Sequence, residues 1–339
     1  MSFDESKLIN YISEAILIIN EEGYIEYQND YSKNLFRKFS KKPNIIEIFP
    51  GLDLSILSID EKPFQKLEIE LFYKIDNFEV IPFDIEISEI AVKKFVLVLK
   101  NISQKKTLEK VHRDFVSNVS HELRSPLTSL IGFLELLINE DNMDEPMRDR
   151  FLKIMSEESN RMELLVEDLL LLSRVEIDKG EEVFVSIPIV PLVKSVANSL
   201  SIKLIRKCMS VQIITPDSSN TTKATISGIE DEIHTVFVNL IENAIKYGFD
   251  GTQIKIVICC LDGRYSEVKI INEGDLIQEP HIKRLTERFY RIDKSRSRSI
   301  GGTGLGLAIV KHILIRHKTT LSIKSTSDEG NIFGIKFFK

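Results

Sequence analysis

Hydrophobic and polar positions divide the chain into three regions that differ in their period. Residues 1–100 alternate short apolar runs with turn signals, which predicts strands of an antiparallel sheet. From about residue 105, apolar positions recur every three or four residues, which predicts long amphipathic helices. Residues 181–339 mix the two patterns. We therefore expect a multidomain α+β protein with domains at 1–104, 105–180 and 181–339.

The first region predicts a small antiparallel sheet. Glu21–Gly23 has the composition of a tight turn between two strands, and a short helix is expected over 30–39. The predicted strands are 15–20, 24–28, 66–73, 80–87 and 95–99.

The second region predicts two long helices joined by a short turn. One apolar stripe runs from Leu108 to Leu137 and another from Phe151 to Val175. Pro146 is suited to the first turn of the second helix, and Gly180 to its C-cap. A single helical hairpin has more apolar face than it can bury by itself. We therefore expect a homodimer whose two hairpins form a four-helix bundle.

The third region predicts an α/β sandwich from its alternation of strand and helix patterns. Its predicted strands are 183–187, 224–228, 253–260, 267–272 and 321–324, and its predicted helices are 189–207, 231–247 and 305–316.

Composition is that of an ordinary globular protein. The 339 residues carry 45 basic and 51 acidic side chains, a net charge of −6, which argues against a nucleic-acid partner. No apolar run approaches the roughly 18 residues of a membrane span. The acidic start does not resemble a secretory signal. Three cysteines without metal-ligand spacing fit reduced thiols, so a cytoplasmic location is expected.

His121 lies on the polar side of the first long helix, where a solvated surface histidine is the ordinary interpretation. Two neighbours favour chemistry instead. Glu122 can accept a proton from the imidazole, which makes a ring nitrogen nucleophilic. Pro126 costs about 3 kcal/mol inside a helix and is expected to bend it beside the histidine.

The segment Ser120–Thr128 resembles the phosphoacceptor box of sensor histidine kinases, with Ser125 where threonine is usual. The longer run 113–135 is most similar to that of the phosphate-regulon sensor kinases. The resemblance implies that His121 is phosphorylated, with Glu122 as its base. It also implies that Ser125 positions water when a phosphorylated regulator is dephosphorylated.

A second group of polar side chains occupies one face of the predicted helix 231–247. Asn239, Asn243, Lys246 and Tyr247 fall within about 100° of one another. Amide oxygens can bind Mg²⁺, lysine can meet phosphate, and tyrosine offers a face to a base. The alternative is the solvated face of an amphipathic helix.

A glycine-rich loop, 301–307, opens the last predicted helix, and its backbone amides can hold phosphate oxygens. Upstream, residues 288–298 contain five basic residues and one acid, a composition suited to a lid over polyphosphate. The basic residues are Arg288, Arg291, Lys294, Arg296 and Arg298.

Together these segments resemble the ATP-binding domain shared by histidine kinases, gyrase and Hsp90. The resemblance implies that Asn239 and Asn243 hold Mg²⁺ and that Lys246 and Arg291 meet phosphates of ATP. An amide at position 239, where the gyrase branch has a glutamate, favours transfer over hydrolysis. The remaining nucleotide contacts are expected at Tyr247, Asn272, Gly274, Gly302, Thr303, Gly304, Leu305 and Gly306.

Three positions depart from that family pattern. Asn272 replaces the aspartate that accepts from the adenine amino group, and Leu276 replaces a glycine. The segment 317–319 lacks the glycine pair usual after the last helix. We expect the contact with the base to be weakened, by about 1 kcal/mol for the missing charge.

The first hundred residues resemble a PAS sensor domain in 15–29 and in the exit strand 95–99. Residues 1–111 contain no histidine or cysteine, which excludes haem or flavin attached through those side chains. A relay module without ligand and a sensor of a small organic ligand both stay open.

The chain is thus expected to be a sensor histidine kinase. ATP phosphorylates His121, and the phosphoryl group passes to an aspartate on the receiver domain of a response regulator, with regulator phosphatase activity as a further possibility. The main alternative is a degenerate, non-catalytic kinase that serves as a docking scaffold for regulators. An ATP-hydrolysing module is a third interpretation.

Overall fold

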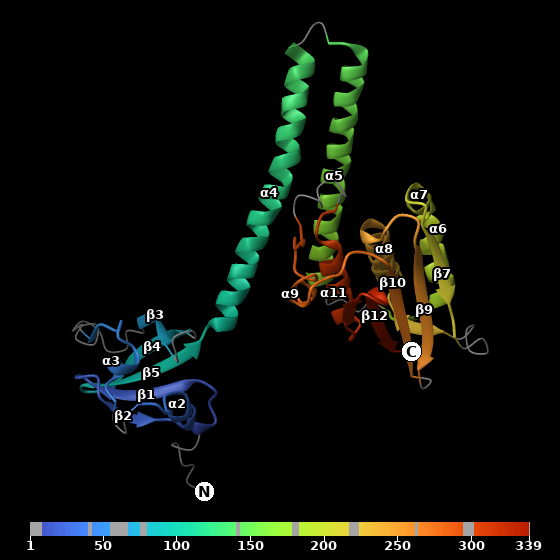
Figure 1. Cartoon of the computed structure of the whole chain (residues 1–339). Coiled ribbons are helices and arrows are strands. Elements are labelled where there is room, and N and C mark those ends of the chain that lie inside the picture. The colour runs from blue at the N-terminus through green and yellow to red at the C-terminus, as the bar shows by residue number, and fades with distance from the viewer. Residues whose placement is uncertain are drawn as a thin grey trace. The chain divides into compact units, whose positions relative to one another are not determined.

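The computed structural model describes residues 9–39, 43–54, 67–74, 80–139, 143–177, 183–216, 224–261, 264–293 and 302–338. These residues form two compact units, 1–117 and 118–339 (Figure 1).

The first unit contains a five-stranded antiparallel sheet in the order β2-β1-β5-β4-β3. This confirms the predicted strands, of which the third, fourth and fifth end later than expected. Two short helices, α2 (Asp30–Leu35) and α3 (Ile45–Ile48), follow β2. The strands are β1 (Ala15–Asn20), β2 (Ile25–Gln28), β3 (Leu67–Lys74), β4 (Val80–Ala91) and β5 (Lys94–Asn101).

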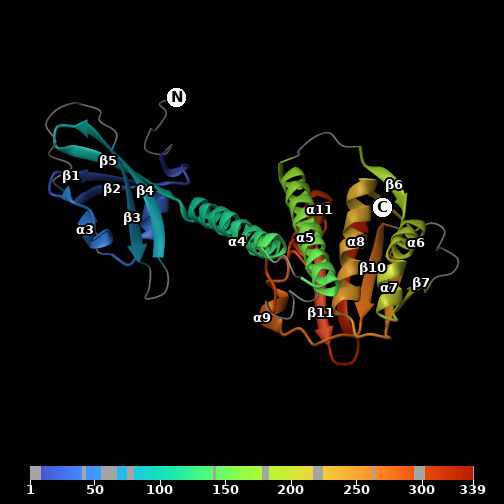
Figure 2. The ribbon, with the colours of Figure 1, turned by 90° about the horizontal axis from the view of Figure 1, so that it is seen from above.

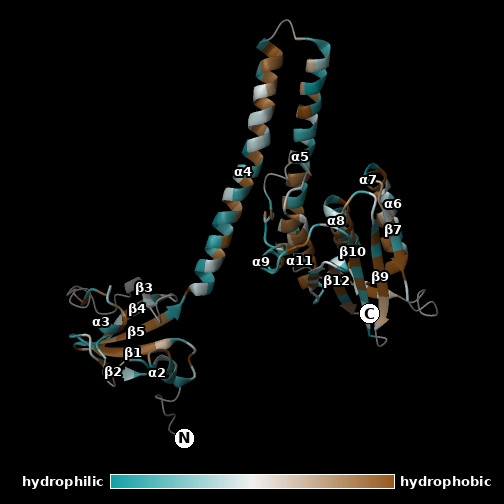
Figure 3. Ribbon diagram, viewed as in Figure 1, coloured by the Kyte–Doolittle hydropathy of each residue, from teal (hydrophilic) through white to brown (hydrophobic). Residues whose placement is uncertain are grey.

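One face of this sheet forms the core of the first unit. Along β5, buried Phe95, Leu97 and Leu99 alternate with more exposed residues, as the two-residue period of a strand requires. Hydrophobic residues dominate β1 and β5 in Figure 3. Aromatic rings from strands and from the residues directly after α2 and α3 meet in this core, with centroids 5.1 to 6.5 Å apart. They are Phe36, Phe49, Tyr73 and Phe83.

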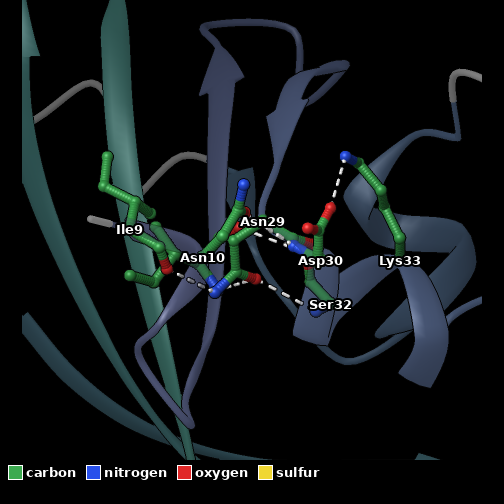
Figure 4. A network of polar contacts seen from close by, with 7 residues as sticks. Ile9, Asn10, Asn29, Asp30, Ser32 and Lys33 are labelled. Carbon is green, nitrogen blue, oxygen red and sulfur yellow. Dashed lines mark hydrogen bonds and ion pairs between the residues drawn. The ribbon is translucent and has the colours of Figure 1, made fainter. Parts of the chain in front are cut away.

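Asn29 joins β1, β2 and α2 through a fully buried amide. Its Oδ1 accepts from the backbone N–H of Ile16 and of Ser32, at 3.1 and 3.0 Å. Its Nδ2 donates to the carbonyl oxygens of Glu14 and Ile9, at 2.8 and 3.3 Å. Figure 4 shows the contacts of Asn29 with Ile9 and Ser32. One side chain therefore caps α2 and fixes the segment that enters β1.

The helical hairpin consists of α4 (Ser103–Asn139) and α5 (Glu145–Ile177), as expected. The α-helix continues through Pro126, which is buried, so the proline does not end it. Near the turn the rings of Phe133 and Phe151 lie 5.0 Å apart. The expected cap at Gly180 lies outside the described residues.

The remaining part of the second unit is a two-layer sandwich. Its sheet has the order β11-β12-β10-β9-β7, in which β7 pairs parallel to β9 and the other neighbours are antiparallel. A separate two-stranded sheet joins β6 and β8. Helices α6, α8 and α11 form the second layer (Figures 1 and 2).

The bounds of these elements are β6 (Val185–Pro188), α6 (Ile189–Ser199), α7 (Ser201–Arg206), β7 (Ser210–Ile214), β8 (Thr225–Gly228), α8 (Glu230–Tyr247), β9 (Gln253–Leu261), β10 (Tyr265–Asn272), α9 (Glu279–Ile282), α11 (Gly306–Arg316), β11 (Leu321–Thr326) and β12 (Gly330–Phe338).

The single helix predicted over 189–207 is wrong, because the chain forms α6 and α7 with an interruption at Leu200. The Ser199 hydroxyl donates to the carbonyl of Val196 at 2.8 Å, a local bond that competes with helix continuation. Strands β7 and β12 were not predicted. Within the described residues, no helix combines the length and hydrophobicity that crossing a membrane needs.

Candidate functional site

The α8 helix separates an apolar side from a polar side as its sequence predicts. Phe237, Leu240, Ile241, Ala244 and Ile245 are buried against the sheet and neighbouring helices. On the other side Asn239, Asn243 and Lys246 are half-buried, and Tyr247 is exposed. The four polar residues therefore share one accessible face.

Asn239 faces the start of α11. Its Nδ2 donates to the carbonyl of Thr235 at 3.0 Å, within α8. Its Oδ1 lies so near Gly306 that a Cβ at position 306 would be 2.4 Å from it. Only glycine lets the loop approach this amide oxygen so closely, and the helix N-terminus adds its partial positive charge there.

Lys246 belongs to a small charged cluster on the same helix. Its Nζ lies 3.4 Å from Glu242 Oε2, and Lys203 of α7 contacts the other carboxylate oxygen. Burial alone would raise the pKa of Glu242, but the hydrogen bond from Lys203 and the charge of Lys246 hold it below its ordinary value. Glu242 therefore stays ionised beside Lys246.

The glycine-rich loop packs against the segment that ends at Arg291. Phe289 donates its N–H to the carbonyl of Gly304 at 2.9 Å, and both residues have positive φ, 61° and 73°. A Cβ at Gly302 would lie 3.9 Å from Arg291 Nη2. Arg291 thus faces the loop, whereas Lys294, Arg296 and Arg298 of the predicted lid and Gly301 of the predicted loop lie outside the described residues.

Asn272 and Gly274 lie where β10 ends beside the last turn of α8. Asn272 is 2% exposed, and its Nδ2 is 3.5 Å from the carbonyl of Glu273. A Cβ at Gly274 would be 2.5 Å from the carbonyl oxygen of Tyr247, so the segment after β10 can approach the end of α8 this closely only with glycine at position 274. Leu276 is exposed. Leucine in place of glycine at position 276 therefore does not obstruct the close approach of Gly274 to Tyr247.

On α4, His121 is exposed, as its place on the helix predicts, and so is Ser125. Glu122 points to the second hairpin helix, where its Oε2 lies 3.1 Å from Arg161 Nη2. Arg161 was missed in the sequence. Because α4 ends at Asn139 and α5 begins at Glu145, residues 122 and 161 lie at similar distances from these two ends, and that symmetry could have indicated the pair.

A second set of contacts links α5 to the glycine-rich loop and to α11. Thr303 Oγ1 donates to Asp168 Oδ2 at 2.5 Å, and Glu176 contacts both Arg288 and His312, the latter at 3.2 Å. Burial raises the pKa of Asp168 and lowers the pKa of His312 despite the nearby Glu176 carboxylate. No sequence motif marks Asp168 or Glu176.

Two groups of predicted residues thus emerge. One gathers α8, the loop before α11 and the end of β10 around a polar face, and the other lies on α4 around His121. The part of the second unit that follows the hairpin packs against it through α11 and α5.

Both groups coincide with known families. Residues 111–177 match the family described as "His Kinase A (phospho-acceptor) domain". Residues 228–339 match the family described as "Histidine kinase-, DNA gyrase B-, and HSP90-like ATPase". The second match implies ATP binding.

Relatives align over nearly the whole chain. The phosphate regulon sensor protein PhoR of Haemophilus influenzae is 32% identical over 97% of this chain and 74% of its own length. PhoR of Pseudomonas aeruginosa is 29% identical over 96% of this chain and 72% of its own. The sensor protein kinase WalK of Staphylococcus aureus (strain Newman) is 30% identical over 95% of this chain and 53% of its own length.

Among solved structures, the histidine kinase ThkA, in complex with response regulator protein TrrA, has the same fold, with a TM-score of 0.54 at 20% identity. It covers 99% of this chain, and 98% of ThkA is matched. The chain belongs to the sensor histidine kinases and, among them, to the PhoR-like kinases. It is a protein-histidine kinase of two-component signalling.

The hairpin agrees with the predicted homodimer. Large apolar side chains of both helices remain exposed in one copy of the chain, and a partner hairpin in a four-helix bundle would bury them. They are Leu127, Ile131, Leu134, Ile138, Leu152, Leu164 and Leu170.

Proposed function

We propose that His121 is the phosphoacceptor, with Glu122 as its base and the polar face of α8 as the site of Mg²⁺-ATP. The observation that carries the proposal is the exposed imidazole at position 121 with a carboxylate directly after it on α4. An exposed nucleophile can be reached by a nucleotide that a separate domain carries.

The bonds and the proton of the phosphoryl transfer can be accounted for with ATP, His121 and Glu122. An unprotonated ring nitrogen of His121 attacks the γ-phosphorus of ATP in line, and a nitrogen–phosphorus bond forms. The bond from the γ-phosphorus to the bridging oxygen breaks, and ADP leaves with its electron pair. The proton on the other ring nitrogen passes to Glu122.

The nucleotide face fits a divalent cation and a triphosphate. Amide oxygens are ligands that Mg²⁺ accepts, and the Oδ1 of Asn239 is presented toward Gly306 while its Nδ2 is held by Thr235. Asn239 and Asn243 would hold Mg²⁺, which supplies charge neutralisation for the phosphates. Lys246 and Arg291 bind phosphate oxygens.

The other predicted residues complete the nucleotide site. The N–H groups of the loop before α11 contact phosphates at a helix N-terminus. Tyr247, Asn272 and Gly274 border the base. The loop residues are Gly302, Thr303, Gly304, Leu305 and Gly306.

The phosphoryl acceptor after His121 is an aspartate on the receiver domain of a response regulator. Support comes from the solved relative ThkA, which forms a complex with a response regulator protein, and from the exposed position of His121 on the hairpin. Ser125, exposed one turn later, positions water for dephosphorylation of that regulator.

Residues 1–104 are proposed to be a PAS-like input domain, supported by the five-stranded antiparallel sheet with α2 and α3 beside it. Residues 105–180 form the phosphotransfer hairpin and 181–339 the ATP-binding domain. The kinase part works in the cytoplasm, where its substrate ATP is found and where its three free cysteines stay reduced.

The test is incubation of the purified chain with ATP labelled at the γ-phosphate. We expect an acid-labile, alkali-stable label that requires Mg²⁺, is abolished by a chelator and transfers to a receiver domain. Asn243→Ala is expected to lose the label while keeping its thermal transition. Absence of label at millimolar ATP in the folded chain would contradict the proposal and favour the docking scaffold.

A further inference from the structure

We propose that Arg161 is a positioning residue for phosphoryl transfer and that it acts through Glu122. The inference rests on the proposed function, because it requires Glu122 to be the base. Arg161 Nη2 lies 3.1 Å from Glu122 Oε2, so this contact joins α5 to α4 directly beside His121.

The pair is better protected from water than an ordinary surface ion pair. The Arg161 side chain is 24% exposed and that of Glu122 is 33% exposed. Partly buried charges are screened less by salt and solvent than exposed ones. Arginine also stays charged at every physiological pH, so the field that it exerts on Glu122 is constant.

A second carboxylate lies near Arg161 on its own helix. Glu158 Oε2 lies 4.0 Å from Arg161 Nη1, the other terminal nitrogen of the guanidinium. That oxygen is buried and has no hydrogen-bond partner among the described residues. The guanidinium thus lies between two carboxylates and directs its hydrogen bond to Glu122.

This arrangement restricts the side chain of Glu122. An unrestrained glutamate on a helix surface samples several rotamers, and the ion pair restricts its carboxylate to one region beside α5. Arg161 thus prepares the base without touching ATP.

Arg161→Met in the full chain should lower the kcat of autophosphorylation about tenfold, part of the roughly hundredfold that a general base contributes. The KM for ATP should stay unchanged, because ATP binds to another domain. Arg161→Lys keeps the charge and should restore most of the rate. Arg150→Met, an exposed arginine on the same helix, should leave kcat unchanged.

A double-mutant cycle decides whether Arg161 acts through Glu122. We expect Glu122→Gln/Arg161→Met to be no slower than Glu122→Gln alone. An equal further loss in the double variant, or an unchanged kcat in Arg161→Met, would overturn the inference. If Arg161→Met loses its thermal transition, Arg161→Gln, which removes the charge but stays polar, takes its place in the cycle with Glu122→Gln.

Failure of the proposed function gives a different pattern. If Glu122→Gln autophosphorylates at full rate on His121, Glu122 is not the base and this inference falls, while the kinase activity stands. If His121→Gln keeps the label, the assignment of the phosphoacceptor itself is wrong.

Discussion

Thr303 donates its hydroxyl proton to Asp168, so the glycine-rich loop before α11 is tied to the second hairpin helix by a 2.5 Å hydrogen bond. The same hydroxyl oxygen accepts the N–H of Leu305 at 3.2 Å, which directs its proton to the carboxylate. Burial raises the pKa of Asp168. Because the Asp168 carboxylate is partly buried at this contact, its ionisation costs free energy.

Asp168→Asn should stabilise the second unit increasingly as pH rises. The folded-state pKa of Asp168 lies above its unfolded value of about 3.9. The contribution of Asp168 to the free energy of unfolding is therefore fully present below about pH 3.9. It is lost as pH rises through the raised pKa. Asparagine keeps an acceptor for Thr303 and carries no charge.

Thermal melts between pH 4 and 8 measure this effect. The gain in Tm from Asp168→Asn should be small near pH 4 and larger near pH 7. Asp149→Asn, at an exposed position on the same helix, should show no such trend. A pH-independent difference for Asp168→Asn would contradict the assigned cause.

Asn29→Ala should destabilise the first unit by about 3 kcal/mol, because it leaves several buried backbone groups unpaired. Hydrogen exchange of the amides of β1 and β5 reports this loss. The matched variant is Asn10→Ala, which removes one exposed contact to the N–H of Asp30 and should cost less than about 1 kcal/mol. Equal losses of stability in the two variants would show that the buried hydrogen bonds of Asn29 do not stabilise the first unit.

Gly306→Ala should weaken Mg²⁺-ATP binding about tenfold, equal to about 1.4 kcal/mol. The new Cβ would lie 2.4 Å from Asn239 Oδ1, so the amide oxygen must move. Because only a side chain has to shift, the melting temperature should change little. Gly302→Ala, whose Cβ would make an ordinary 3.9 Å contact with Arg291, should lose less affinity.

Titration with a fluorescent ATP analogue compares the two glycine variants with the unchanged chain. Unaltered affinity in Gly306→Ala would mean that Asn239 does not face the nucleotide.

Lys318→Gly should stabilise the ATP-binding part by roughly 0.5–1 kcal/mol. Lys318 has φ of +54° and stands at the C′ position after α11, where glycine carries no strain. The bonds of a Schellman motif are present, from Thr319 N–H to Leu314 and from Lys318 N–H to Ile315. Lys311→Gly, exposed within α11, should instead lower the Tm by the cost of glycine in a helix. A lower Tm in Lys318→Gly would refute the assigned strain.

The periodicity of hydrophobic residues predicted most helices and strands because most of them bury one side. β5 alternates buried and more exposed residues, and α8 buries one side of the helix. β7 was not predicted because it is a short, partly exposed strand at the edge of the described sheet, where β9 is its neighbour. β12 contains Gly330 and Gly334, which weaken its strand pattern, although Phe333, Ile335 and Phe337 are buried at alternate positions.

The polar residues of α8 could be predicted because one helix carries them all. Arg161 and Asp168 could not be assigned from local spacing, because their partners Glu122 and Thr303 are 39 and 135 residues away in the chain. The missing glycine pair does not prevent the turn after α11, since Lys318 adopts the left-handed conformation at a cost.

The central claim is that the phosphoryl group resides on His121. Peptide mapping of the chain after incubation with Mg²⁺-ATP, at alkaline pH to preserve phosphohistidine, locates it. His112 is also exposed on α4 and provides the matched position. We predict that His121→Gln abolishes the label and that His112→Gln retains it. Full labelling of His121→Gln, or a phosphate mapped to another residue, would contradict the account.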